Sequence, residues 1–91
     1  MFIKNLKNCA EIIAGDKTIL RELLHGPKEK LAVRYSLAYA IVKSGETSAP
    51  HKLKVSEVYY ILEGRGRMFV GKESAEVSAG QAICIPPYST Q

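Results

Sequence analysis

The sequence predicts an all-β fold, and three observations support this prediction. Residues 31–42, LAVRYSLAYAIV, carry large apolar or aromatic side chains at every second position, which is the period of a strand. Several shorter apolar runs follow at close spacing within residues 55–85. Glycine-containing turns separate these runs and Pro86 and Pro87 end the last one, as is typical of a barrel or sandwich of short strands.

The N-terminal third gives less regular signals. Two short apolar pairs, residues 2–3 and residues 12–13, are interpreted as an N-terminal strand and a brief turn or helix. Residues 18–25, TILRELLH, fit a helix with leucines on one side or a strand with alternating faces. Because this segment has only eight residues before Gly26 and Pro27 stop it, we favour a strand.

The C-terminal half is expected to contain four strands, at residues 55–62, 67–70, 73–77 and 81–85. Turns are expected between them, at Gly64 to Gly66, Gly71 with Lys72, and residues 78–80. No internal repeat or low-complexity segment interrupts the pattern. We therefore expect residues 1–91 to form one domain with one core.

Composition narrows the classes of function. The hydrophobic content of 46% and charged content of 24% are those of an ordinary globular chain, and no apolar run approaches the roughly 18 residues that a membrane span requires. The N-terminal residues lack the apolar core of a secretory signal, so we expect a cytoplasmic protein. Cys9 and Cys84 form no metal-type pair and are expected to be buried thiols rather than a disulfide.

The net charge of +4 does not indicate a nucleic-acid-binding protein. The basic residues are spread singly with glutamates between them, and no stripe follows a phosphate backbone. A local excess of Lys52, Lys54, Arg65 and Arg67 would favour a small anionic ligand. Solvated strand faces are the other interpretation of these four side chains.

His51 and Glu57 are the pair of residues with the clearest chemical potential. An imidazole and a carboxylate are ligands that suit first-row divalent metals, and a histidine in a loop can reach a glutamate on the next strand. One histidine and one glutamate six residues apart are also compatible with a structural role. In that interpretation His51 caps the loop and Glu57 pairs with a neighbouring arginine or lysine.

The spacing of residues around this pair resembles the first motif of the cupin superfamily. That motif runs here through Gly45, His51, Leu53, Glu57 and Gly64, and the second motif resembles the stretch from Gly80 through Pro86 to Gln91. The intervening sequence is similar to that of small single-domain cupins. The resemblance implies a jelly-roll β-barrel that often holds a metal.

The resemblance also implies a ligand set of three histidines and one glutamate, which this chain only partly provides. His51 matches the first histidine and Glu57 the glutamate, whereas Leu53 stands at the second histidine and Gln91 at the third. Tyr88 stands where the second motif usually has glycine. The metal ligands expected from this comparison are therefore His51, Glu57 and Gln91, for zinc, iron, manganese or nickel.

Two functions of different classes follow from this partial match. The first is a cupin that binds a divalent metal and a small molecule, with sugar-phosphate isomerase-like or dioxygenase-like chemistry if it is an enzyme. The second is a metal-free cupin that serves as a ligand-binding or scaffold module, which Leu53 and Gln91 favour. The side chains considered as cavity-lining residues are His25, Tyr39, Leu53 and Tyr59, although tyrosines on strands are often plain packing residues.

The resemblance finally predicts strands beyond the second motif, which ends at Gln91. A barrel without its last strands would expose sheet edges, so we expect either a fragment of a longer protein or a partner that covers the gap. Small cupins often dimerise by exchanging N-terminal strands. We therefore expect a homodimer in which residues 2–4 pair across the interface.

Overall fold

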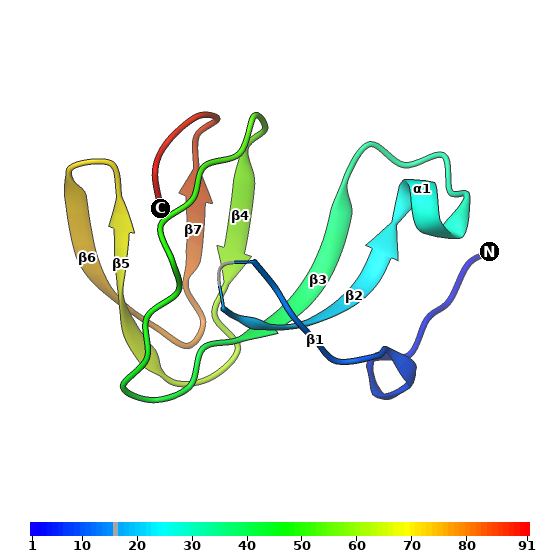
Figure 1. Cartoon of the computed structure of the whole chain (residues 1–91), viewed down its shortest axis with the longest axis horizontal. Helices are drawn as coiled ribbons and strands as arrows, with labels where there is room; N and C mark the ends of the chain where they lie inside the picture. The colour runs from blue at the N-terminus through cyan, green and yellow to red at the C-terminus, as the bar shows by residue number, and fades with distance from the viewer. Residues whose placement is uncertain (16) are drawn as a thin grey trace. The chain divides into compact units, whose positions relative to one another are not determined.

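The fold is described by a computed structural model covering residues 1–15 and 17–91 (Figure 1). Contacts divide the chain into two compact units, residues 1–49 and residues 50–91. Within the described ranges, no helix is both long enough and apolar enough to span a membrane.

The first unit is built on a three-stranded antiparallel sheet. Its elements are η1 (Leu6–Asn8), β1 (Ile12–Ile13), β2 (Ile19–His25), α1 (Gly26–Glu29) and β3 (Ser36–Ile41). The strand order is β1-β2-β3, with β2 in the centre (Figure 1). The strand interpretation of residues 18–25 is confirmed, since β2 takes up nearly all of that segment.

Two expectations for the first unit are wrong. Residues 12–13 form β1, which pairs with β2, whereas residues 2–3 lie outside any strand of the sheet. The long strand expected at residues 31–42 begins only at Ser36 because its partner β2 ends at His25, which pairs with Ser36. The preceding residues instead fold back, with the Leu31 amide donating to the Gly26 carbonyl over 2.9 Å.

The junction between β2 and α1 is fixed by polar contacts. His25 is the N-cap of α1, and its Nδ1 accepts a hydrogen bond from the Lys28 amide. The His25 amide donates to the Glu29 carboxylate over 2.6 Å, and that carboxylate also forms a 2.8 Å ion pair with Lys4. Lys30 then ends the helix in the left-handed conformation. These contacts explain why the alternating pattern of β2 stops at His25.

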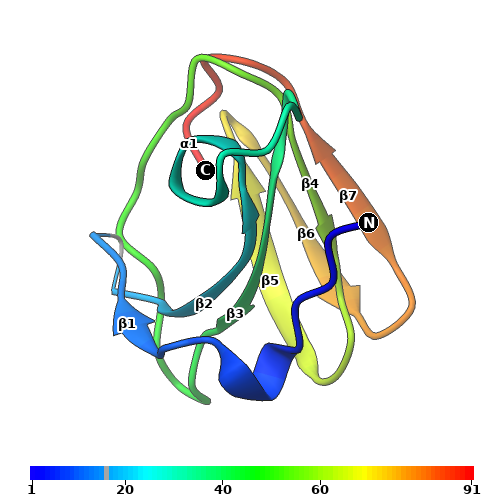
Figure 2. The ribbon, with the colours of Figure 1, turned by 90° about the vertical axis from the view of Figure 1, so that its right-hand side faces the viewer.

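The second unit contains two antiparallel hairpin-like sheets. Its strands are β4 (Glu57–Tyr60), β5 (Arg65–Val70), β6 (Glu73–Ser78) and β7 (Ala82–Ile85). β4 pairs directly with β7, and β5 pairs with β6 (Figure 2). The β5–β6 hairpin therefore lies between β4 and β7 in the sequence but not in the sheet. All four expected strands are present, although β4 is shorter than residues 55–62.

The β4–β7 sheet has one protected and one exposed face. Glu57 lies opposite Ile85, which is 1% exposed and is the most buried large side chain of the described residues. On the other face Val58 is 65% exposed and lies opposite Cys84. Cys84 is an exposed free thiol, so the expectation of two buried thiols holds only for Cys9. Cys84 is exposed because neighbouring residues of a strand point to opposite faces of the sheet, and Ile85 occupies the protected face.

The prediction of an all-β fold is confirmed, because strands dominate and helix is confined to single short turns. The hydrogen bonds of the described residues join these strands into three separate sheets rather than one closed barrel.

Candidate functional site

Two segments distant in sequence run side by side in the second unit, and together they contain two of the three expected metal ligands, His51 and Gln91. His51 and Gln91 exchange both backbone hydrogen bonds, with N–O distances of 3.1 and 2.9 Å. Two residues further on, the Tyr88 amide donates to the Leu53 carbonyl over 2.7 Å. In Figure 1 the red C-terminal end accordingly lies next to the green segment that precedes β4. The backbone thus brings the first and last expected metal ligands together.

Left-handed backbone conformations explain the glycines that anchor the two motifs. Gly45, Gly64 and Gly80 have φ angles of +80°, +86° and +89°, which only glycine adopts without strain. Tyr88 has φ of +63° at the position where the second motif usually has glycine. The backbone is therefore in the conformation that glycine favours, and this chain holds a tyrosine in it.

Gln91 is held at its side chain as well as at its backbone. The Tyr59 hydroxyl donates a 2.8 Å hydrogen bond to the Gln91 amide oxygen, and both groups are part-buried. An amide oxygen has two lone pairs, so this bond leaves one of them for another donor or a cation. Tyr59 therefore fixes the direction in which the amide oxygen of Gln91 points.

Glu57 is the unusual residue of the site. Its side chain shares a strand face with Tyr59, two residues along β4, so the two side chains start about 7 Å apart. One carboxylate oxygen, Oε1, is buried and has no hydrogen-bond partner among the described residues. Burying such an oxygen without compensation costs roughly 1–3 kcal/mol. This is an acceptor that a cation or a ligand donor would satisfy.

These contacts form one connected arrangement. His51 pairs with Gln91 through the backbone, Gln91 accepts from Tyr59, and Tyr59 lies beside Glu57 on β4. The described residues contain no group of three histidine, cysteine, aspartate or glutamate side chains suited to a metal. Any three-ligand protein site here therefore depends on the amide oxygen of Gln91.

Comparison with known proteins agrees with the motifs. The family described as "Cupin domain" matches residues 38–90, more than half of the chain. The chain belongs to the cupin family. An uncharacterised protein of Methanocaldococcus jannaschii is 50% identical over 76 residues, which span 82% of this chain and 60% of that protein's length. No solved structure matches the chain.

The other expected site residues of this cupin lie in different surroundings. Leu53 follows His51 on the segment that pairs with residues 88–91, and it is 39% exposed. His25 caps α1 and Tyr39 pairs with Arg21 in the sheet of the first unit. A cavity-lining role for these residues remains a prediction, whereas the capping contact gives His25 a structural role.

Tyr59 and Gln91 were both expected from the sequence, but the hydrogen bond between them was not. The alternation of residues 55–62 places Tyr59 on the face of Glu57, and this facing is confirmed by the register of β4. Its hydrogen bond to Gln91 joins residues 32 positions apart. The one sequence signal for this contact was the resemblance to the family, whose ligand set includes the positions of both Gln91 and Glu57.

Proposed function

We propose that this cupin binds a divalent metal through His51, Glu57 and Gln91 and uses the site to bind a small molecule. The observation that supports this proposal is the buried Oε1 of Glu57, which lacks a hydrogen-bond partner among the described residues. A carboxylate in this condition is stabilised by a cation. A neutral residue at this position would avoid the cost of burial.

The chemistry of the donor groups is compatible with such a metal. An imidazole, a carboxylate and an amide oxygen suit zinc, iron, manganese or nickel, with the amide as the weakest of the three ligands. The remaining lone pair of the Gln91 oxygen is available because Tyr59 occupies only one. Coordination positions beyond these three are left to water or to the bound molecule, as in a catalytic rather than a structural site.

When bound, the metal supplies Lewis-acid chemistry, which polarises a carbonyl of a bound molecule. Sugar-phosphate isomerase-like and dioxygenase-like reactions are the activities that the family resemblance suggests for such a centre. The residues of this chain would orient the site, since Tyr59 holds the Gln91 amide and the backbone pairs His51 with Gln91.

A second candidate function is a metal-free module that binds a small molecule without catalysis. Leu53 at the position of a family histidine favours it, because a leucine cannot bind a metal. In this case a donor group of the bound molecule, rather than a metal, satisfies the Glu57 oxygen.

Metal titration of chelator-treated protein distinguishes the two candidates. Calorimetry with Zn²⁺, Mn²⁺ and Ni²⁺ should give one site per chain for the wild type and no binding for His51→Ala or Glu57→Gln. Glu57→Gln should also raise the stability of the metal-free protein, because it replaces a carboxylate that has one buried oxygen without a partner by a neutral amide. The control is Glu63→Gln, which removes an exposed glutamate beside the same strand. Metal binding that His51→Ala and Glu57→Gln leave unchanged would refute the metal proposal.

We also propose that the protein is a homodimer that uses its N-terminal residues at the interface. Ile3 is 81% exposed and Phe2 43% exposed, which leaves two large apolar side chains without cover. Sedimentation at micromolar concentration should give a dimer, and Ile3→Lys should shift it toward monomer. A monomeric wild type would contradict this.

A further inference from the structure

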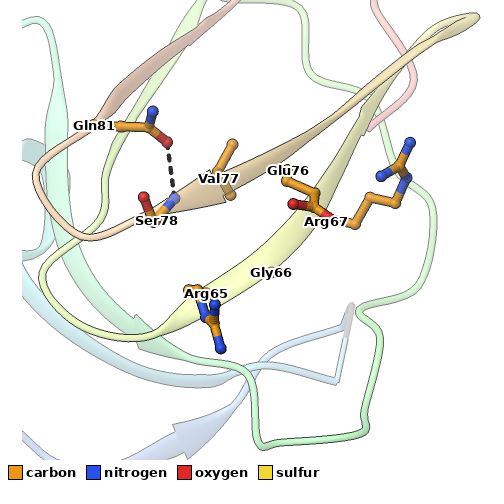
Figure 3. A pocket seen from close by; sticks show the side chains of 7 residues that line it. All are labelled: Arg65, Gly66, Arg67, Glu76, Val77, Ser78 and Gln81. Carbon is orange, nitrogen blue, oxygen red and sulfur yellow. Dashed lines mark hydrogen bonds between the residues drawn. The ribbon is translucent and has the colours of Figure 1, made fainter.

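The β5–β6 hairpin carries a groove that the metal proposal does not involve. It has a volume of about 590 Å³ and is lined largely by polar side chains (Figure 3). These polar side chains belong to Arg65, Arg67, Glu76, Ser78 and Gln81. All of them come from one hairpin and the turn that follows it, so the groove lies within the second unit.

The register of the hairpin places two arginines on one face. Arg65 lies opposite Ser78 and Arg67 lies opposite Glu76. Residues two apart on a strand point the same way and are separated by about 7 Å. As placed, the two guanidinium groups diverge, because Arg67 reaches along the hairpin to Ser74, away from Arg65 (Figure 3). To hold one ligand between them, both flexible side chains would turn toward each other.

The hydrogen bonds of this face leave most arginine donors unused. Arg67 donates one bond, from Nη2 to the Ser74 hydroxyl over 3.2 Å. In the described ranges Arg65 has no hydrogen bond or ion pair from its side chain, and no ion pair joins either arginine to Glu76. The side chain of Gln81 is held at the end of β6, where its Oε1 accepts a hydrogen bond from the Ser78 amide over 2.8 Å (Figure 3).

We propose that this groove binds a phosphate group, either inorganic phosphate or the head of a small phosphomonoester. Each guanidinium offers a planar fork that fits two anionic oxygens. Once both side chains turn toward the groove, the two forks and the Ser78 hydroxyl can approach one ligand from several directions. A tetrahedral phosphate has enough oxygens to use them together. A single carboxylate is already satisfied by one arginine.

Glu76 sets the kind of phosphate compound that fits. Its carboxylate lies opposite Arg67 in the register and offsets one positive charge, which disfavours ligands with a second anionic group nearby. The same carboxylate accepts hydrogen bonds from hydroxyl groups. A hydroxyl-bearing phosphomonoester such as glycerol phosphate should therefore bind better than a bisphosphate.

Amide NMR of the full chain tests the proposal, with inorganic phosphate, glycerol phosphate and acetate as probes at constant ionic strength. We expect shift changes centred on residues 65–67 and 74–81 with both phosphate probes. Arg65→Gln and Arg67→Gln should each weaken phosphate binding about tenfold, because each removes one charged fork. Arg65→Lys should fall between, and Glu76→Gln should strengthen the binding of inorganic phosphate, because it removes a negative charge. The matched control, Lys72→Gln in the turn of the same hairpin, should bind almost as the wild type does.

Equal weakening by Arg65→Gln and Lys72→Gln would overturn the proposal, since it would show only a general effect of charge. Acetate binding as tightly as phosphate would overturn the choice of phosphate. The titration is repeated with chelator and with His51→Ala, and unchanged phosphate binding is expected because the groove is independent of the metal proposal. If Arg65→Gln loses the β5–β6 amide pattern, the Arg65→Lys titration decides instead, and undiminished phosphate binding by that variant would overturn the arginine role.

Discussion

The Tyr59 hydroxyl donates a hydrogen bond to the amide oxygen of Gln91 over 2.8 Å, and this bond joins the two motifs of the family through their side chains. It adds to the paired backbone bonds between His51 and Gln91. Gln91 is thus constrained at both ends, which is what a neutral ligand needs if it is to bind in one fixed direction.

Removing that hydroxyl should affect both stability and metal affinity. Tyr59→Phe is expected to lower the free energy of unfolding by about 1 kcal/mol, because a part-buried amide oxygen loses its donor. It should also weaken metal binding roughly 10- to 100-fold, as loss of an orienting partner does. Urea unfolding and metal titration measure the two effects. The control is Tyr60→Phe, which alters a 62% exposed tyrosine on the opposite face of β4; equal losses in the two variants would contradict the orienting role.

Restoring the family's second histidine should strengthen the metal site. Leu53 follows His51 by two residues on the segment paired with residues 88–91, and it is 39% exposed, so a histidine is accommodated there. Leu53→His is expected to raise the affinity for Zn²⁺ or Ni²⁺ at least tenfold, because an imidazole is a far better ligand than water. Competition with a chelating dye measures this. The comparison variant is Lys54→His, which adds the same group one residue along; an equal gain there would show nonspecific binding.

Tyr88 should be replaceable by glycine with little or no loss. Its φ of +63° costs a non-glycine residue about 1–2 kcal/mol, whereas glycine in place of tyrosine loses about 0.5–1 kcal/mol of chain entropy. Tyr88→Gly is therefore expected to leave stability unchanged or to raise it by up to about 1 kcal/mol. The same change at Tyr60, which has similar exposure on a regular strand, should destabilise by about 1 kcal/mol. Equal destabilisation of the two variants in urea would contradict a left-handed Tyr88.

The contact between Lys4 and Glu29 predicts a pH dependence of stability. The Lys4 ammonium, and after it the His25 amide, hold the pKa of Glu29 below its usual value of 4.5. Because the folded-state pKa is the lower one, this contribution is complete above about pH 4.5 and is lost as the pH falls further. The same bond raises the pKa of Lys4 above 10.5, so its contribution is lost only at still higher pH.

Glu29→Gln should therefore reduce stability at neutral pH and flatten the decline of stability on acidification. Thermal unfolding from about pH 3 to pH 7 measures both effects. Glu63→Gln serves as the control because Glu63 is exposed and forms no ion pair among the described residues. An acid decline as steep in Glu29→Gln as in the wild type would count against the pair.

The strands could be predicted where their own pattern decides the structure. Residues 73–77 and 81–85 alternate between glycine turns, and β6 and β7 follow them closely. Residues 31–35 alternate equally well, but β2 ends at His25 and offers them no partner. The first residue of β3 thus depends on the length of the neighbouring strand, and the residue pattern of β3 itself does not predict it.

The residues of the candidate site could be predicted from the sequence, but the contacts between them could not. The motif spacing identified Glu57 and Gln91 before their surroundings were known. The hydrogen bond from Tyr59 to Gln91 depends on the tertiary fold, and the pairing of Arg65 with Ser78 depends on the register of a hairpin. Neither arrangement can therefore be predicted from the residue pattern of a single segment.

The most direct test of the metal proposal is a crystal structure of protein soaked with Mn²⁺ or Zn²⁺, with anomalous diffraction recorded at the metal edge. We expect one strong peak about 2 Å from a His51 nitrogen, the Glu57 carboxylate and the Gln91 amide oxygen. The Oε1 atom of Glu57, which lacks a partner among the described residues, should be one of its ligands. No peak at Glu57, or a peak only at surface residues elsewhere, would contradict the proposal.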